Sequence, residues 1–362
     1  MLKIALGMAK IGTLESFDSQ YIEKRLGVVK KLSQFGRVFI DTSPIYGTGF
    51  SERMLSKVFK DEPEKFFIAT KYYPQSHHSE IDLIKSVNES MDRMHIKHLD
   101  LIQIHWPNPE ANLRRILNGF LQLRSEGLVS NLGVCNYSNN EILQLQEEVP
   151  EIQILSNQTE LNIGNMYSEL NDSLSIGIKQ IAYGSILQGR LTFSQKQRMA
   201  IINFAESNKI SPAATALAVI FYNFNQILPV LKISSESHLL EFMDVLTGRD
   251  DLSGLNLELS GMSGGVIYIN PSQVLLTGDS FRKPYLTIEE AKKNSLDLFP
   301  SPVSLSKRIS KYNLVLPIKV VRNSMQSFSI DPYDPFDQIK KYWAWRISYP
   351  NEPIPVQIFE NV

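Results

Sequence analysis

Three side chains of different chemistry stand at the ends of three successive apolar runs. Asp41 follows VFI, Lys71 follows FFIAT and His105 follows LIQI, at intervals of roughly thirty residues, the length of one strand-helix unit. Tyr46 lies in a glycine-bearing loop shortly after Asp41. Such groups suit proton transfer to a carbonyl oxygen, because an ammonium lowers the pKa of a nearby phenol and an imidazole can donate a hydrogen bond to the oxygen. A carboxylate would keep the ammonium charged, and hydride for the carbon would come from another molecule.

The elements that must position these residues form a regular alternation. Strands are expected in eight short apolar runs, at 3–8, 37–42, 65–71, 100–106, 131–136, 153–161, 179–185 and 229–233. Their continuous apolarity is typical of strands buried on both faces of a parallel sheet, and amphipathic stretches such as 81–94 and 113–127 predict helices between them. Eight such units in about 250 residues predict an α/β fold, a (β/α)8 TIM barrel. Neighbouring strands lie ~4.8 Å apart, so the three strand ends are expected to share one site on the catalytic face.

The composition changes after the last of these units. Residues 247–265 are rich in Gly, Ser and Asp, which predicts a linker. Beyond it, apolar runs alternate with helix candidates at 303–312 and 338–346 and predict a small mixed α/β C-terminal module. The expected domains are a barrel at 1–248, a linker at 249–264 and the module at 265–362.

Bulk properties argue against several classes of partner. The chain has 362 residues, a net charge of -1 and a single cysteine, Cys135. The charge gives no reason to expect nucleic acid or an anionic membrane as partner. One cysteine excludes an intramolecular disulfide and fits a reducing compartment, and the apolar runs are too short to cross a bilayer. We therefore expect a cytoplasmic protein.

Each candidate residue also has an ordinary structural interpretation. Asp41 alone could form a turn, Lys71 could be a surface charge and His105 could be a core histidine. His77 and His78 lie in an expected loop without a third ligand at metal spacing, so no metal site is predicted. The chemical interpretation is favoured because the four groups fall in register.

The four residues and their surroundings resemble the aldo-keto reductase family. The family's Asp, Tyr, Lys and His tetrad matches Asp41, Tyr46, Lys71 and His105, and QIHWP is similar to the family's LIHWP. GVCNYS, NQTELN and AYGSILQGRL are similar to the family's GVSNF, NQ-x-E-x-N and AYSPLG-x-G. The resemblance runs from about residue 3 to 247.

The resemblance implies reduction of an aldehyde or ketone with NADP, or with NAD as the alternative, bound across the barrel mouth without a Rossmann glycine fingerprint. The family's serine and arginine at the 2'-phosphate are Ile233 and His238 here, which leaves the choice of cofactor open. The implied cofactor contacts are Met8, Asn136, Gln158, Tyr183, Gly184, Ser185, Leu187, Gly189, Lys232, Ile233, Ser234, His238 and Glu241. Short loops predict an open pocket for a polar or sugar-like carbonyl, with walls formed by Phe50, Tyr72 and Trp106.

The C-terminal segments INPSQVLL, LVLPIKVV and IPVQIF resemble the ParB/sulfiredoxin-like fold, without that fold's nucleotide and phosphate residues after Ile330. The module is therefore expected to serve as a lid, a contact between copies or a docking surface. Tyr342, Trp343 and Trp345 are either its core or the anchors of such a contact. The alternative function is a cofactor-binding regulatory or channel-associated-type subunit, in which residues 265–362 contact a protein partner or a second copy.

Overall fold

The computed structural model describes two compact units. The described residues are 2–9, 19–60, 62–161, 176–186, 195–224, 226–247, 267–269, 274–275, 288–289, 302–312, 318–324, 327–330 and 335–359. The first unit comprises Met1–Pro107, Ala111–Leu191 and Met199–Leu259. The second comprises Asn108–Glu110, Thr192–Arg198 and Ser260–Val362. The linker and the exact domain limits stay predictions.

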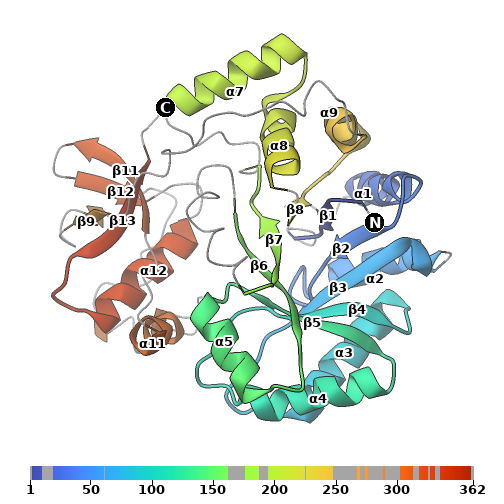
Figure 1. The fold of residues 1–362 in the computed structure, drawn as a ribbon, viewed down its shortest axis with the longest axis horizontal. Helices are drawn as coiled ribbons and strands as arrows, with labels where there is room; N and C mark the ends of the chain where they lie inside the picture. Colours follow the sequence, from blue (N-terminus) through green and yellow to red (C-terminus); the bar gives the residue numbers. More distant parts are fainter. Residues whose placement is uncertain are drawn as a thin grey trace. The chain divides into compact units, whose positions relative to one another are not determined.

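The first unit contains a closed barrel of parallel strands (Figure 1). Each strand pairs with the next along the chain, and β1 pairs with β8 to close the barrel. The strands are β1 Ala5–Gly7, β2 Val38–Asp41, β3 Phe66–Tyr72, β4 Leu99–Ile104, β5 Val129–Cys135, β6 Ile154–Glu160, β7 Lys179–Tyr183 and β8 Ile227–Leu231. The predicted (β/α)8 barrel is confirmed.

Helices surround these strands, and several begin at a serine cap. Ser138 and Glu141 form a reciprocal capping box, and Ser211 accepts a hydrogen bond from the Ala214 N–H before a proline-led helix. The described helices of this part of the chain are α1 Ser19–Leu32, α2 Phe50–Phe59, α3 Glu80–Met94, α4 Leu113–Ser125, α5 Asn139–Glu148, α7 Gln195–Asn208, α8 Pro212–Asn223 and α9 Glu236–Leu246, with a short 3-10 turn η2 at Pro63–Lys65. None of the helices in the described ranges is long and apolar enough to cross a membrane.

Strand register determines which side chains face the barrel interior. Phe39 and Ala69 belong to the interior cluster, together with residues of β1, β4 and β7. Side chains alternate along a strand, so Asp41 and Lys71, each two residues further on, point into the same interior. The parallel pairing sets Asp41 beside Ala69 and Lys71 beside Gln103, which brings the carboxyl ends of β2, β3 and β4 together.

The second unit is built on a mixed sheet, as the sequence predicts. Its strand order is β10-β12-β11-β13-β9, with parallel and antiparallel pairs. The strands are β9 Ile267–Ile269, β10 Val274–Leu275, β11 Ile318–Ser324, β12 Ser327–Ile330 and β13 Ile354–Phe359. Helices α11 Pro302–Tyr312 and α12 Pro335–Ser348 accompany the sheet. The likeness to the ParB/sulfiredoxin-like fold stays a prediction, and residues 331–334, which bear on it, lie outside the described residues.

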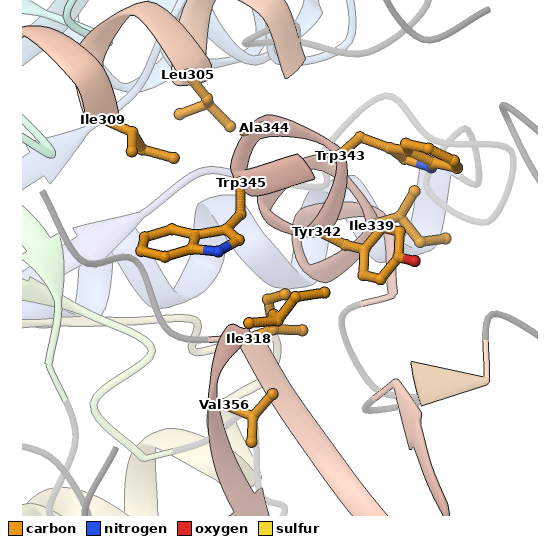
Figure 2. Packing of buried hydrophobic residues seen from close by; sticks show 10 residues of the cluster. Leu305, Ile309, Ile318, Ile339, Tyr342, Trp343, Ala344, Trp345 and Val356 are labelled. Carbon is orange, nitrogen blue, oxygen red and sulfur yellow. The ribbon is translucent and has the colours of Figure 1, made fainter. Parts of the chain in front are cut away.

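The aromatic residues of α12 form the core of this unit. Tyr342, Trp343 and Trp345 are buried in one cluster with apolar residues of α11, β11 and β13 (Figure 2). The indole N–H of Trp345 donates to the carbonyl of Pro353 at 3.0 Å, which satisfies its polar atom inside the cluster. These side chains therefore stabilise the unit itself and are not exposed anchors.

Two helical glycines of the barrel unit allow a matched test of packing. A Cβ added to Gly119 on α4 would lie 2.5 Å from the carbonyl oxygen of Glu80, whereas one added to Gly27 on α1 would meet nothing within 4 Å. We expect Gly119→Ala to lower the free energy of unfolding by about 1–3 kcal/mol, because backbone cannot yield as a side chain can. Gly27→Ala should raise it by about 0.5–1 kcal/mol through helix propensity. Urea denaturation checks both, and equal effects would contradict the close contact of α3 and α4.

Candidate active site

Lys71 is the centre of the site, and its ammonium has three hydrogen-bond acceptors. Its Nζ donates to Asp41 Oδ1 at 2.7 Å, to the carbonyl of Thr42 at 3.0 Å and to the hydroxyl of Tyr46 at 3.1 Å. Lys71 is 1% exposed and Asp41 3%. The three protons of the ammonium are thus all used, as burial of a charge requires.

The charge of Lys71 persists despite its burial. Burial lowers the pKa of Lys71, but the Asp41 carboxylate and Tyr46 raise it, and the net change is upward. The ammonium is therefore positive at neutral pH, as the sequence predicts.

Tyr46 is held over the ammonium by a tight loop between β2 and α2. Its backbone N–H donates to the Ser43 carbonyl at 3.0 Å, and three left-handed residues follow it, Gly47, Thr48 and Gly49. Burial raises the pKa of the phenol, the Lys71 ammonium opposes this, and the net pKa is raised. The predicted lowering of the pKa of Tyr46 is wrong, because the effect of burial on the phenol is larger than that of the Lys71 ammonium. Tyr46 consequently keeps its proton at neutral pH.

His105 directly follows β4, and its imidazole is neutral. Its backbone N–H donates to the Tyr72 carbonyl at 2.8 Å, and its ring meets the Tyr46 ring edge-on with centroids 6.1 Å apart. Burial and the nearby Lys71 ammonium lower the pKa of His105 well below its ordinary value. Its Nδ1 lies 3.4 Å from the Ser43 hydroxyl. A hydroxyl donating to Nδ1 favours the tautomer with its proton on Nε2, which can then serve as a donor.

Two glutamines complete the environment of Asp41. Gln158 on β6 donates to Asp41 Oδ1 at 2.9 Å, and Gln103 on β4 donates to the same oxygen at 3.3 Å. Gln103 was missed by the sequence reasoning, although its place two residues before His105 puts it on the same face of β4. Gln158 was predicted as a cofactor contact, and in the structure its amide orients the carboxylate.

A buried carboxylate paired with a half-buried arginine lies behind the loop that carries Tyr46. Glu52 on α2 is fully buried and accepts from Arg93 Nε at 2.7 Å and from Thr70 Oγ1 at 2.7 Å. Gly49 packs on the Arg93 side chain, where an added Cβ would lie only 2.8 Å from Cδ. This arrangement joins α2, β3 and α3 behind the site. The sequence does not predict this ion pair, because a charged residue on an amphipathic helix is usually exposed.

The residues predicted to hold the nicotinamide lie together at the ends of β5, β6 and β7. The N–H of Asn136 donates to the Gln158 carbonyl at 2.9 Å, and the Tyr183 hydroxyl donates to Asn136 Oδ1 at 3.0 Å. Asn136 has a φ of 59° and Gly184 a φ of 69°, which turns the chain sharply after each strand. Ser185 is buried and donates to the Ala182 carbonyl. Leu187 and Gly189 lie outside the described residues.

The predicted 2'-phosphate segment follows β8 and leads into α9. Ser234 Oγ lies 2.8 Å from Nδ1 of His238, and Ser235 caps the helix. Lys232 and Glu241 are exposed, whereas the Ile233 side chain is fully buried and offers no polar group. A helix N-terminus with hydroxyls around it is a suitable environment for a phosphate.

The three predicted pocket walls have different neighbours among the described residues. Trp106 lies nearly parallel to His105 with ring centroids 6.4 Å apart, and Phe50 is half-buried at the start of α2. Tyr72 is the last residue of β3, and its hydroxyl lies 2.6 Å from Nδ1 of His78. It lines a pocket of about 260 Å³ together with Ser43, Pro44, Ile45, Lys71, Tyr73, His78, Asp82, Lys85, Ser86 and Glu89. Their roles in substrate binding stay predictions.

The described residues contain no cluster of three or more His, Cys, Asp or Glu side chains suited to a metal ion. The site is instead an acid, a phenol, an amine and an imidazole on the face formed by the strand carboxyl ends. The chain thus contains a (β/α)8 barrel with this hydrogen-bonded group at the end where barrel enzymes have their active sites.

Comparison with known proteins agrees with this fold. An uncharacterized oxidoreductase of Mycobacterium bovis is 30% identical over 138 residues, which are 38% of this chain and 42% of that protein. The 6-dehydroglucose reductase of Novosphingobium aromaticivorans is 25% identical over 233 residues, or 58% of this chain and 76% of that protein. The crystal structure of an aldo/keto reductase from Klebsiella pneumoniae in complex with NADP and acetate has a TM-score of 0.58 at 21% identity, covering 67% of this chain and 85% of that one. The matched part of the chain thus spans less than half of the Mycobacterium bovis protein.

A model of the aldo/keto reductase family matches residues 3–249, which is most of the chain. The protein belongs to the aldo/keto reductase family. The matched residues include all eight strands of the barrel.

The neutral state of His105 predicts a pH dependence of stability. The unfolded chain binds a proton on this histidine near pH ~6.5, whereas the folded chain resists it because the pKa of His105 is lowered. Stability should therefore fall as pH decreases below about 6.5, by up to ~1.4 kcal/mol per pH unit from this group. His105→Gln should make the dependence shallower by that amount, and exposed His77→Gln should not. Denaturation at several pH values measures both, and equal slopes in all three proteins would show that His105 protonates equally in both states.

Proposed function

We propose that the protein reduces an aldehyde or a ketone, with NADPH as the hydride donor and Tyr46 as the proton donor. One observation carries the proposal: Lys71 is bonded at once to Asp41 and to the Tyr46 hydroxyl, in a buried site on the catalytic face of the barrel. Membership in the aldo/keto reductase family supports it.

Side chains of the protein donate the proton and stabilise the charge that its transfer leaves behind. The Tyr46 hydroxyl transfers its proton to the carbonyl oxygen, and the ammonium of Lys71 stabilises the phenolate that remains. Asp41, fixed by Gln103 and Gln158, keeps Lys71 charged and in place. The nicotinamide cofactor, when bound, supplies hydride to the carbonyl carbon. The product is an alcohol, and Tyr46 regains its proton from water.

Neutral His105 binds the same oxygen during the reaction. An imidazole that keeps a proton on Nε2 donates a hydrogen bond to the carbonyl and strengthens it as negative charge develops. A charged imidazolium would compete with Tyr46 as the proton donor, so the lowered pKa of His105 leaves proton donation to Tyr46.

The residues present fit an anionic dinucleotide. Asn136, Gln158 and Tyr183 would hold the nicotinamide, and the turn at Ser185 would approach the pyrophosphate. Residues 232–241 would hold the 2'-phosphate at the start of α9. A polar atom of a buried cation beneath this segment, Nε of Arg25, has no hydrogen-bond partner within the described part of the chain, which fits a neighbouring anion. The NADP bound by the Klebsiella pneumoniae relative supports NADP over NAD.

A polar or sugar-like carbonyl compound is the proposed substrate class. It is supported by the similarity to a 6-dehydroglucose reductase and by the hydrogen-bonded polar side chains of Asp41, Tyr46 and Lys71. Contact of residues 265–362 with a partner or a second copy stays a prediction, as does a cytoplasmic location.

Removal of one hydroxyl tests the proposal. Tyr46→Phe should lower kcat for aldehyde reduction by about 10²–10⁴-fold, because the proton donor is lost. The dissociation constant of NADPH, measured by quenching of its fluorescence, should stay unchanged. Tyr222→Phe on α8 removes a phenol outside the site and should keep full activity.

A panel of small aliphatic, aromatic and sugar aldehydes identifies turnover by the loss of NADPH absorbance. Undiminished turnover in Tyr46→Phe would refute Tyr46 as the donor. Failure of the unaltered protein to bind NADPH and to reduce every aldehyde of the panel would refute the function.

A further inference from the structure

A buried arginine connects the first and last strands of the barrel. Arg25 lies on α1 and is 1% exposed. Its guanidinium donates to the carbonyl of Gly7, at the end of β1, at 2.8 Å and to the carbonyl of Ile233, just after β8. It also contacts the sulfur of Met8 at 3.3 Å. Both Met8 and Ile233 are among the predicted cofactor contacts.

This guanidinium remains a largely uncompensated charge. Burial lowers the pKa of Arg25 to about 10, an effect that Tyr21 partly opposes, so the group is still positive at neutral pH. Its Nε lacks a hydrogen-bond partner, and no carboxylate among the described residues lies within ion-pair distance of it. Two carbonyl dipoles and a thioether do not neutralise a buried cation, which makes an anion beside it favourable.

The segment above Arg25 is arranged for an anion in other respects too. Ser235 caps α9, so the N–H groups and the positive end of the helix dipole lie next to Ser234 and His238. Glu236 in the first turn would repel a phosphate, but its carboxylate is paired with Lys31 of α1. The arginine expected from the family likeness at position 238 is a histidine here. The segment thus lacks the exposed arginine charge at position 238, whereas the buried charge of Arg25 lies next to Ile233.

From this geometry we infer that Arg25 is a positioning residue whose buried charge favours a 2'-phosphorylated nucleotide on residues 232–238. Arg25 donates a hydrogen bond to the Ile233 carbonyl. Its positive charge replaces part of the charge that an arginine at position 238 would have provided for the 2'-phosphate. The inference rests on the proposed use of NADPH.

The hydrogen bonds of Arg25 to Gly7 and Ile233 could serve only to connect β1 and β8. The test therefore separates the effect of the positive charge from that of the hydrogen bonds. Arg25→Lys keeps a cation with fewer donors, whereas Arg25→Gln keeps neutral donors without the charge. Lys24→Gln removes an exposed charge from the same turn of α1 and serves as the control. Dissociation constants of NADPH and NADH are measured on the full chain by fluorescence quenching, and those of adenosine 2',5'-bisphosphate and ADP by calorimetry.

We expect Arg25→Gln to weaken the binding of NADPH and adenosine 2',5'-bisphosphate about tenfold, the order of one unit charge acting through protein. Binding of NADH and ADP should be unchanged. Arg25→Lys and Lys24→Gln should keep the preference for the 2'-phosphate. Circular dichroism checks folding, and if Arg25→Gln does not fold, Arg25→Met takes its place as a neutral side chain of similar volume.

Equal weakening of both kinds of nucleotide, or no weakening, overturns the inference and leaves the proposed function intact. Loss of the preference for the 2'-phosphate in Arg25→Lys also overturns the inference, since the hydrogen bonds of the arginine and not its charge would then be required. If the unaltered protein binds neither NADPH nor NADH, the proposed function fails and this inference fails with it.

Discussion

The buried ion pair of Lys71 and Asp41 is the interaction on which the site depends. Two charges withdrawn from water are stable only when their remaining donors and acceptors are filled. Here the partners come from three strands or their loops: Thr42 and Tyr46 follow β2, Gln103 lies on β4 and Gln158 on β6, and each bonds to one member of the pair. The barrel must therefore be closed and in register before the pair is tolerable. In turn, Lys71 of this pair donates a hydrogen bond to the Tyr46 hydroxyl and helps to fix the phenol in place.

Much of this arrangement follows from the sequence because it depends on local rules. Continuous apolar runs identified the strands, and parallel register placed Asp41, Lys71 and His105 side by side. The pKa of Tyr46 was beyond such reasoning, because desolvation depends on everything packed around the phenol and outweighed the ammonium. The charges of Glu52 and Arg25 were missed for a related reason. Their partners are brought near by helix packing, and neither spacing nor periodicity marks a buried charge.

The second unit shows the same limit from another side. Tyr342, Trp343 and Trp345 are close along α12 and would suit either a core or an exposed contact. Their burial depends on α11 and the sheet, which cover several sides of the helix. The order of elements was predictable here, whereas the use of each aromatic side chain required the tertiary structure.

The pairing of β1 with β8 has a consequence for the order in which the protein matures. Arg25 and its acceptor Ile233 are 208 positions apart, so the arginine is synthesised long before its partner. At ribosomal rates of about 5–20 residues per second, β1 would have one unpaired edge and α1 an unburied cation for roughly ten to forty seconds. Only the arrival of the last strand closes the sheet and, in the same step, forms the segment at the start of α9. A nascent chain would therefore close its barrel and form the segment proposed to bind the nucleotide at the same time.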